Sequence, residues 1–118
     1  MSIELNENLM ASGIAPKKMI KQTPMICSEY LNREFGCDVN LKIEIWNPTG
    51  SHKDRESIRI IETCIKLGVT RVGCASTGNF GCSLAYYSRL YGLECNVWLP
   101  KHIKNPETVK FLQKHFAK

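Results

Sequence analysis

The stretch "NPTGSHKDR", residues 47–55, separates two patterns of different period. Before it, residues 41–46 (LKIEIW) alternate apolar and polar side chains, which predicts a β-strand. After it, isoleucines recur at helical spacing, which predicts a helix from about Asp54 to the residue before Gly68. The stretch is therefore a strand-to-helix turn, and it leaves Lys53 at the start of the helix.

The rest of the chain repeats this order of strand and helix. It continues with a strand at 69–76, a helix at about 82–91, a strand at 94–99 ended by Pro100, and a helix with Asn105 as N-cap and Pro106 as its first residue. Strands separated by single helices pair in parallel through right-handed crossovers. The expected fold is α/β, a three-layer αβα arrangement with a short parallel sheet of three to four strands.

The chain is expected to divide into two parts. Residues 41–118 form the βαβαβα domain. Residues 1–40 form an irregular and helical N-terminal segment, with a short helix at 28–35 closed by Gly36.

The charge and hydropathy patterns do not favour a nucleic-acid-binding or membrane protein. The net charge is +5, but the last 18 residues carry five lysines against Glu107, a pattern typical of the solvated face of a terminal helix. The aromatic residues are not interleaved with arginines as a base-stacking surface requires. No run of about 18 apolar residues predicts a membrane span, and the N-terminus does not resemble a secretory signal.

The six cysteines and three histidines do not have metal-site spacing. There is no C-x-x-C pair, and the histidines stand apart at 52, 102 and 115, so we expect no metal site. Several cysteines lie in apolar runs, where the free thiol behaves as a small hydrophobe. We expect reduced, buried thiols in a cytoplasmic protein.

Two turns are expected to meet at one edge of the sheet. The turns at 47–53 and 76–81 each follow the carboxyl end of a predicted strand. Open parallel sheets bind their ligands at that edge. We therefore predict that the two loops are neighbours in space.

The second loop, "GCASTGNFG" at 73–81, has the character of an anion site. It has neither the Lys-Ser/Thr ending of a P-loop nor the G-x-G-x-x-G of dinucleotide-binding proteins. Small residues leading into a helix N-terminus suit a carboxylate or phosphate. An ordinary βα turn is an equally good interpretation of this loop taken alone.

Lys53 can be interpreted in two ways. An isolated lysine is usually a solvated surface side chain. At a helix N-terminus on the ligand edge, partial burial and the helix dipole disfavour the ammonium form. A neutral amine is the nucleophile that carbonyl chemistry requires, so we favour an imine-forming lysine.

The two motifs together resemble a known family. "NPTGSHKDR" followed by "ASTGNFG" at 75–81 is similar to the fold type II pyridoxal-phosphate enzymes, the tryptophan synthase β superfamily, with threonine synthase as the nearest member. Thr23-Pro24 and Glu44 also stand where family members carry these residues, and the similarity covers about residues 22 to 112.

The resemblance implies a pyridoxal 5'-phosphate cofactor and a set of site residues. Lys53 would form the imine and move the α-proton, Asn79 would hydrogen-bond the cofactor's ring hydroxyl, His52 would contact the phosphate, and Ser76, Thr77, Gly78 and Asn79 would hold the substrate carboxylate. The fold would correspond to the small N-terminal domain of these enzymes.

Two departures from the family limit the expected activity. Glu56 replaces the glycine usual in threonine synthases, and no second glycine-rich loop is present to hold a phosphate. We expect the N-terminal part of a lyase or synthase of amino-acid metabolism, acting by β/γ-elimination or replacement on a small amino acid, and inactive as an isolated, truncated chain. The alternatives are a non-catalytic remnant that binds a small anionic metabolite or partner chain, and, less favoured, a nucleotide-binding module. Open sheet edges predict a homo-oligomer or a companion chain.

Overall fold

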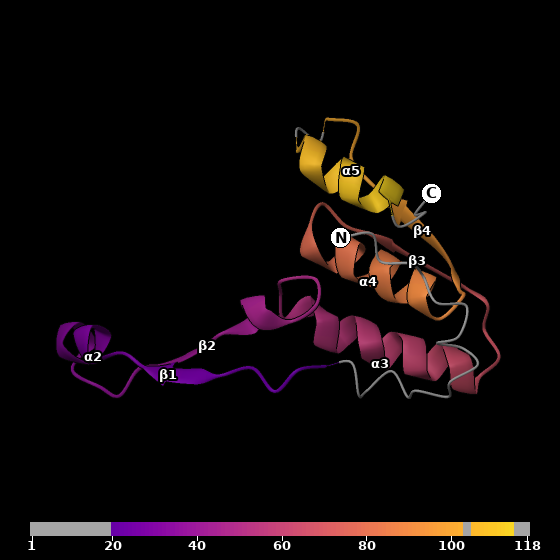
Figure 1. The fold of residues 1–118 in the computed structure, drawn as a ribbon. Helices are drawn as coiled ribbons and strands as arrows, with labels where there is room; N and C mark the ends of the chain where they lie inside the picture. Colours follow the sequence, from indigo (N-terminus) through magenta and orange to yellow (C-terminus); the bar gives the residue numbers. More distant parts are fainter. Residues whose placement is uncertain (1–19, 103–104, 115–118) are drawn as a thin grey trace.

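The computed structural model of the protein describes residues 20–102 and 105–114. Figure 1 shows an extended arm joined to an α/β body. The arm contains β1 (Met25–Cys27), α2 (Glu29–Phe35) and β2 (Asn40–Lys42), and leads through the 3₁₀ helix η2 (Glu44–Trp46) into the body. The body contains α3 (Lys53–Lys66), β3 (Arg71–Ala75), α4 (Asn79–Leu90), β4 (Glu94–Trp98) and α5 (Pro106–Lys114).

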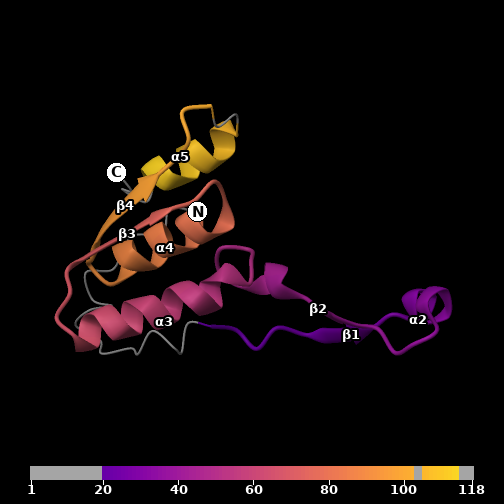
Figure 2. The same ribbon diagram turned by 180° about the vertical axis from the view of Figure 1, so that it is seen from behind.

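The body is built around α4. β3 and β4 pair in parallel, with Gly73 opposite Asn96, and α4 is the crossover helix between them. The views from both sides show α3 and α4 running next to each other (Figures 1 and 2). The buried core joins α3, α4 with its C-cap residue Tyr91, β4 and α5. Its residues are Ile58, Ile61, Leu84, Ala85, Tyr87, Leu90, Tyr91, Cys95, Val97 and Leu112. The α/β class is therefore confirmed.

The first predicted strand is wrong in extent and in pairing. Only Asn40–Lys42 is a strand, and it pairs antiparallel with Met25–Cys27, so that Ile26 faces Leu41. The parallel sheet of the described chain therefore has two strands, where the pattern predicted three to four. The strand ends because the backbone turns into η2, where Glu44 is held by polar side chains from three other positions. The apolar alternation does not mark a buried face here, since Leu41, Ile45 and Trp46 are all exposed.

The remaining elements lie close to where the sequence predicted them. α2 begins after Ser28, whose hydroxyl accepts a hydrogen bond from the Leu31 amide, and ends at Gly36 in the left-handed region (φ 65°). The Oδ1 of Asn105 accepts from the amides of Glu107 and Thr108, so the predicted N-cap of α5 is confirmed. The spacing of Val109, Leu112 and Phe116 also predicts an apolar face on this helix; Leu112 is buried, and Phe116 lies outside the described residues.

Two other expectations are partly tested. Cys95 is buried as predicted, but Cys27 and Cys37 of the arm are exposed, so the expectation of buried thiols is wrong for those two.

β2 spans the proposed domain boundary at residue 40, and the division into two parts stays a prediction. In the described part of the chain, no helix combines the length and the apolar character that crossing a bilayer requires.

Candidate functional site

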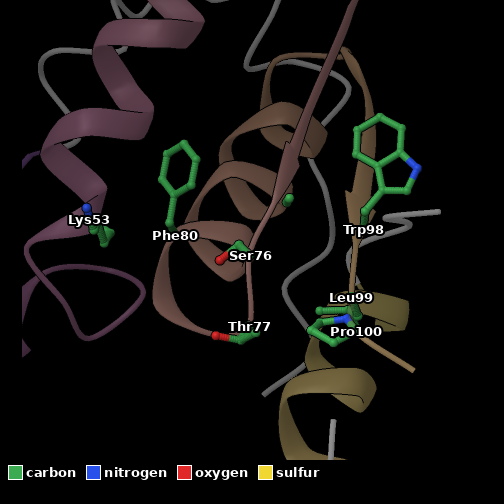
Figure 3. A pocket seen from close by; sticks show the side chains of 8 residues that line it. Lys53, Ser76, Thr77, Phe80, Trp98, Leu99 and Pro100 are labelled. Carbon is green, nitrogen blue, oxygen red and sulfur yellow. The ribbon is translucent and has the colours of Figure 1, made fainter. Parts of the chain in front are cut away.

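A pocket of about 570 Å³ opens where the carboxyl ends of β3 and β4 meet the N-termini of α3 and α4 (Figure 3). It is lined by Lys53, Ala75, Ser76, Thr77, Phe80, Trp98, Leu99 and Pro100. Its chemical character is mixed: one amine and two hydroxyls stand among aromatic and aliphatic side chains. Among these lining residues, Lys53 carries the one ionisable side chain.

The amine of Lys53 is engaged by two neighbours. Its Nζ lies 2.8 Å from Oε2 of Glu56, one turn further along α3, and 5.6 Å from the centroid of the Phe80 ring. The side chain of Lys53 is 35% exposed. The predicted role of Lys53 as an uncharged amine stays a prediction.

Asp54 attaches the lysine turn to α4. Its carboxylate is fully buried and accepts hydrogen bonds from the Thr49 amide (2.8 Å), the Thr49 hydroxyl, the Ser83 hydroxyl (2.9 Å) and the Tyr87 hydroxyl (3.1 Å). Burial, together with the negative charge of Asp54, raises the pKa of the Tyr87 hydroxyl. Lys53 is therefore placed by a neighbour whose side chain points into the core.

This attachment explains why the two loops are close together. The prediction that they are neighbours is confirmed, since Lys53, Ser76 and Thr77 line one pocket. The predicted cause is wrong, because the strand before the lysine turn is not part of the parallel sheet. The packing of α3 on α4 and the hydrogen bonds to Asp54 bring the loops together instead.

A second polar network fixes the other side of the turn. Glu44 accepts from the Arg55 guanidinium through both carboxylate oxygens (2.8 Å each), from the Thr23 hydroxyl (2.6 Å) and from the Asn47 amide (2.7 Å). These hydrogen bonds, with that of Arg55 foremost, lower the pKa of Glu44 to about 2. The network joins Thr23 of the N-terminal segment to both ends of the turn.

The hydroxyl of Ser76 closes the second loop. Its Oγ accepts from the amides of Gly81 (2.9 Å) and Gly78 (3.4 Å), and so it satisfies donors at the start of α4 in place of an N-cap side chain. Gly81 allows this close approach, because a Cβ there would lie 3.1 Å from Cβ of Ser76 and 2.9 Å from Cγ1 of Val97. Ser76 thus has a structural role, and the predicted contact with a substrate carboxylate stays a prediction.

Three of the residues implied by the resemblance lie outside the pocket lining. Asn79 is the exposed first residue of α4, Gly78 precedes it, and His52 is the exposed residue before α3. The structure therefore brings together Lys53, Ser76 and Thr77, but not the other predicted residues. The roles of all six stay predictions.

The far wall of the pocket was missed by reasoning from sequence. Trp98, Leu99 and Pro100 stand across the pocket from Lys53 in Figure 3. The sequence did hold a sign of this wall, because the strand ending at Pro100 was predicted to be parallel and so to end at the ligand edge. Phe80 follows the Ser-Thr-Gly-Asn motif directly and carried no separate signal.

The same region of sequence and structure occurs in known proteins. A family model described as "Pyridoxal-phosphate dependent enzyme" matches residues 17–117. Threonine synthase of Mycobacterium tuberculosis (strain H37Rv) is 40% identical over 79 residues, 67% of this chain and 22% of that protein. Threonine synthase of Methanocaldococcus jannaschii is 45% identical over 80 residues, 67% of this chain and 20% of that protein.

A solved structure gives the same result for the fold. The crystal structure of a pyridoxal 5'-phosphate-dependent aspartate racemase has a TM-score of 0.77 and 25% identity, covering 94% of this chain and 36% of that one. The chain thus spans about a fifth of the length of the two threonine synthases.

Proposed function

The chain belongs to the family of pyridoxal-phosphate-dependent enzymes, and from this premise we propose that it supplies the amine-bearing part of a threonine synthase-like lyase or synthase. The proposed substrate is a small amino acid, and the proposed reaction is a β/γ-elimination or replacement. One observation carries the proposal: the amine of Lys53 shares a pocket with Ser76 and Thr77 at the N-terminus of α4. The similarity to threonine synthases supports the choice of reaction class.

The residues present fit one end of the cofactor. An amine suits its aldehyde, the Phe80 ring offers an apolar surface for a planar ring, and the start of α4 offers amide donors and a positive dipole for a carboxylate. For the phosphate, the 118 residues contain no second glycine-rich loop. We therefore propose that the chain binds the aldehyde end and that a phosphate site requires residues beyond this sequence.

The chain's own residues would divide the work between them. When bound, the cofactor supplies an electron sink for charge that develops at the substrate α-carbon. The amine of Lys53 would hold the cofactor at its aldehyde carbon. Its Nζ would later take the proton from the substrate α-carbon and return it. Thr77 and the first amides of α4 would orient the substrate carboxylate. Trp98, Leu99 and Pro100 would limit access of water from the opposite wall.

Reductive trapping tests the proposal. The purified chain is incubated with pyridoxal 5'-phosphate, reduced with borohydride and digested, and the modified peptides are quantified by mass spectrometry. We expect preferential modification of Lys53 over Lys66, which lies at the far end of the same helix. We also expect weak retention of the cofactor and negligible turnover. Modification spread evenly over the lysines would refute the proposal.

We propose as a second candidate that the chain associates with another polypeptide through its arm. All residues of β1 and β2 are exposed and α2 buries none, so the arm has no core of its own. Its large exposed apolar side chains, with those of η2, are Met25, Ile26, Tyr30, Phe35, Leu41, Ile45 and Trp46. A two-stranded hairpin with so little burial is marginally stable in water. Sedimentation of a stable monomer at all concentrations would argue against this candidate.

A further inference from the structure

The two acidic residues in the first turn of α3 have different environments. Asp54 is buried and accepts four hydrogen bonds, from the amide and hydroxyl of Thr49 in the turn and from the hydroxyls of Ser83 and Tyr87 in α4. Glu56 faces outward with its side chain 50% exposed, and its Oε2 lies 2.8 Å from Nζ of Lys53. Glu56 therefore contacts the amine on which the proposed chemistry depends, although its own side chain does not line the pocket.

We propose that Glu56 is a positioning residue that holds the Lys53 amine in a resting state from which it cannot attack a carbonyl. The inference rests on the proposed function of Lys53. The ring of Phe80 also restrains the amine of Lys53, because a cation 5.6 Å from the ring centroid is attracted to the ring face. The amine must leave the carboxylate before it can turn toward Ser76 and Thr77.

The chemistry of the amine explains why this contact competes with reaction. To react with an aldehyde, the nitrogen must offer its lone pair to the carbonyl carbon. A carbon–nitrogen double bond then forms, the carbonyl oxygen leaves as water, and the proton that the ammonium carried passes to solvent. While Nζ of Lys53 stays 2.8 Å from the carboxylate of Glu56, it cannot also approach a carbonyl carbon in the pocket, so the reactive fraction is the fraction in which this contact has opened.

The expected size of the effect is modest. Both side chains are substantially exposed, and exposed ion pairs at i,i+3 spacing are weak. Removing the carboxylate charge should therefore raise the reactivity of Lys53 about twofold to fivefold.

Competitive acetylation measures this without the cofactor. Limiting acetic anhydride is added at neutral pH and low salt, and the acetylated fraction of Lys53 is measured relative to that of Lys66 in the same digest. The test variant is Glu56→Gln, which keeps the shape of the side chain. The control is Glu94→Gln, because Glu94 is similarly exposed (46%), faces Arg71 at 3.8 Å and lies at the opposite end of β4 from the pocket.

We expect the Lys53:Lys66 ratio to rise about twofold to fivefold in Glu56→Gln and to stay unchanged in Glu94→Gln. Added salt screens an exposed pair, so it should raise the ratio in the unmodified chain and leave Glu56→Gln unaffected. A ratio that does not change in Glu56→Gln, or a salt response that persists in it, would overturn the inference. Reductive trapping in the same two proteins separates the two claims: loss of Lys53 preference there would defeat the proposed function while leaving the acetylation result intact.

Discussion

Asp54→Ala should be among the most destabilising substitutions in this chain. The substitution removes the acceptor for the Ser83 and Tyr87 hydroxyls and for the amide of Thr49. Ser83 and Tyr87 are themselves fully buried, so their hydroxyls would be left without this partner and away from water. Buried donors without partners carry a desolvation cost, and for this reason the loss exceeds that of an exposed carboxylate.

The magnitude follows from the contacts. A hydrogen bond to a charged group contributes about 1.5–3 kcal/mol, but four bonds to one carboxylate are not additive. A buried donor left without its partner costs about 1–3 kcal/mol, and Asp54→Ala leaves at least the Ser83 and Tyr87 hydroxyls in this state, so we expect a loss of about 3–5 kcal/mol. Domains of ordinary stability have about 5–15 kcal/mol in total, so the variant would lose a large share of its stability.

Urea unfolding followed by circular dichroism is the assay, with Ser83→Ala and Tyr87→Phe as single-donor variants. Each should cost about 1.5–3 kcal/mol, because the carboxylate keeps its other partners. Glu94→Gln serves as the surface control and should stay within about 0.5 kcal/mol of the unmodified chain. The reasoning is refuted if Asp54→Ala costs no more than either single-donor variant.

Three further predictions concern pH and packing. The pKa of Glu44 is lowered to about 2, chiefly by Arg55, so its contribution to the free energy of unfolding is complete above pH 4.5 and is lost as the pH falls from 4.5 toward 2. In acid titration, the free energy of unfolding of Glu44→Gln should therefore fall less steeply over this range than that of the unmodified chain. The raised pKa of Tyr87 implies that the free energy of unfolding falls as the pH rises above about 10, and this fall should be shallower in Tyr87→Phe. Gly73→Ala would place a Cβ 2.7 Å from Cζ3 of Trp98, an exposed ring that can move. We therefore expect the free energy of unfolding to fall by only about 1 kcal/mol and the fluorescence of Trp98 to change. The fluorescence is measured in a Trp46→Phe background, so that it reports on Trp98 alone.

The parts of the fold that sequence could predict are those encoded locally. The start of α2 after Ser28 and its end at Gly36 follow from capping chemistry that needs no tertiary contact. The same is true of Asn105-Pro106 at the start of α5. α4 begins at Asn79, earlier than the apolar pattern predicted, because the Ser76 side chain accepts a hydrogen bond from the Gly81 amide and so caps the first turn from outside the helix.

The parts that could not be predicted depend on contacts between distant residues. β1 has no periodic pattern, and it forms only because β2 pairs with it across the intervening helix. The turn into η2 depends on hydrogen bonds from Thr23 and Arg55 to Glu44, which lie 21 and 11 residues away. Alternation along residues 41–46 carried no sign of either contact.

The geometry of one helical turn connects the fold to the proposed chemistry. Successive helical residues point about 100° apart, so Asp54 can enter the core while Lys53 remains at the rim, and residue 56 returns to the side of Lys53. The same short stretch thus contains an anchor, an amine and the carboxylate that restrains the amine. Because the anchor and the restraint lie on different faces of α3, the position of Lys53 and the freedom of its nitrogen are set by separate residues. A substitution at position 56 can therefore change the chemistry of the amine without loosening the turn that carries it.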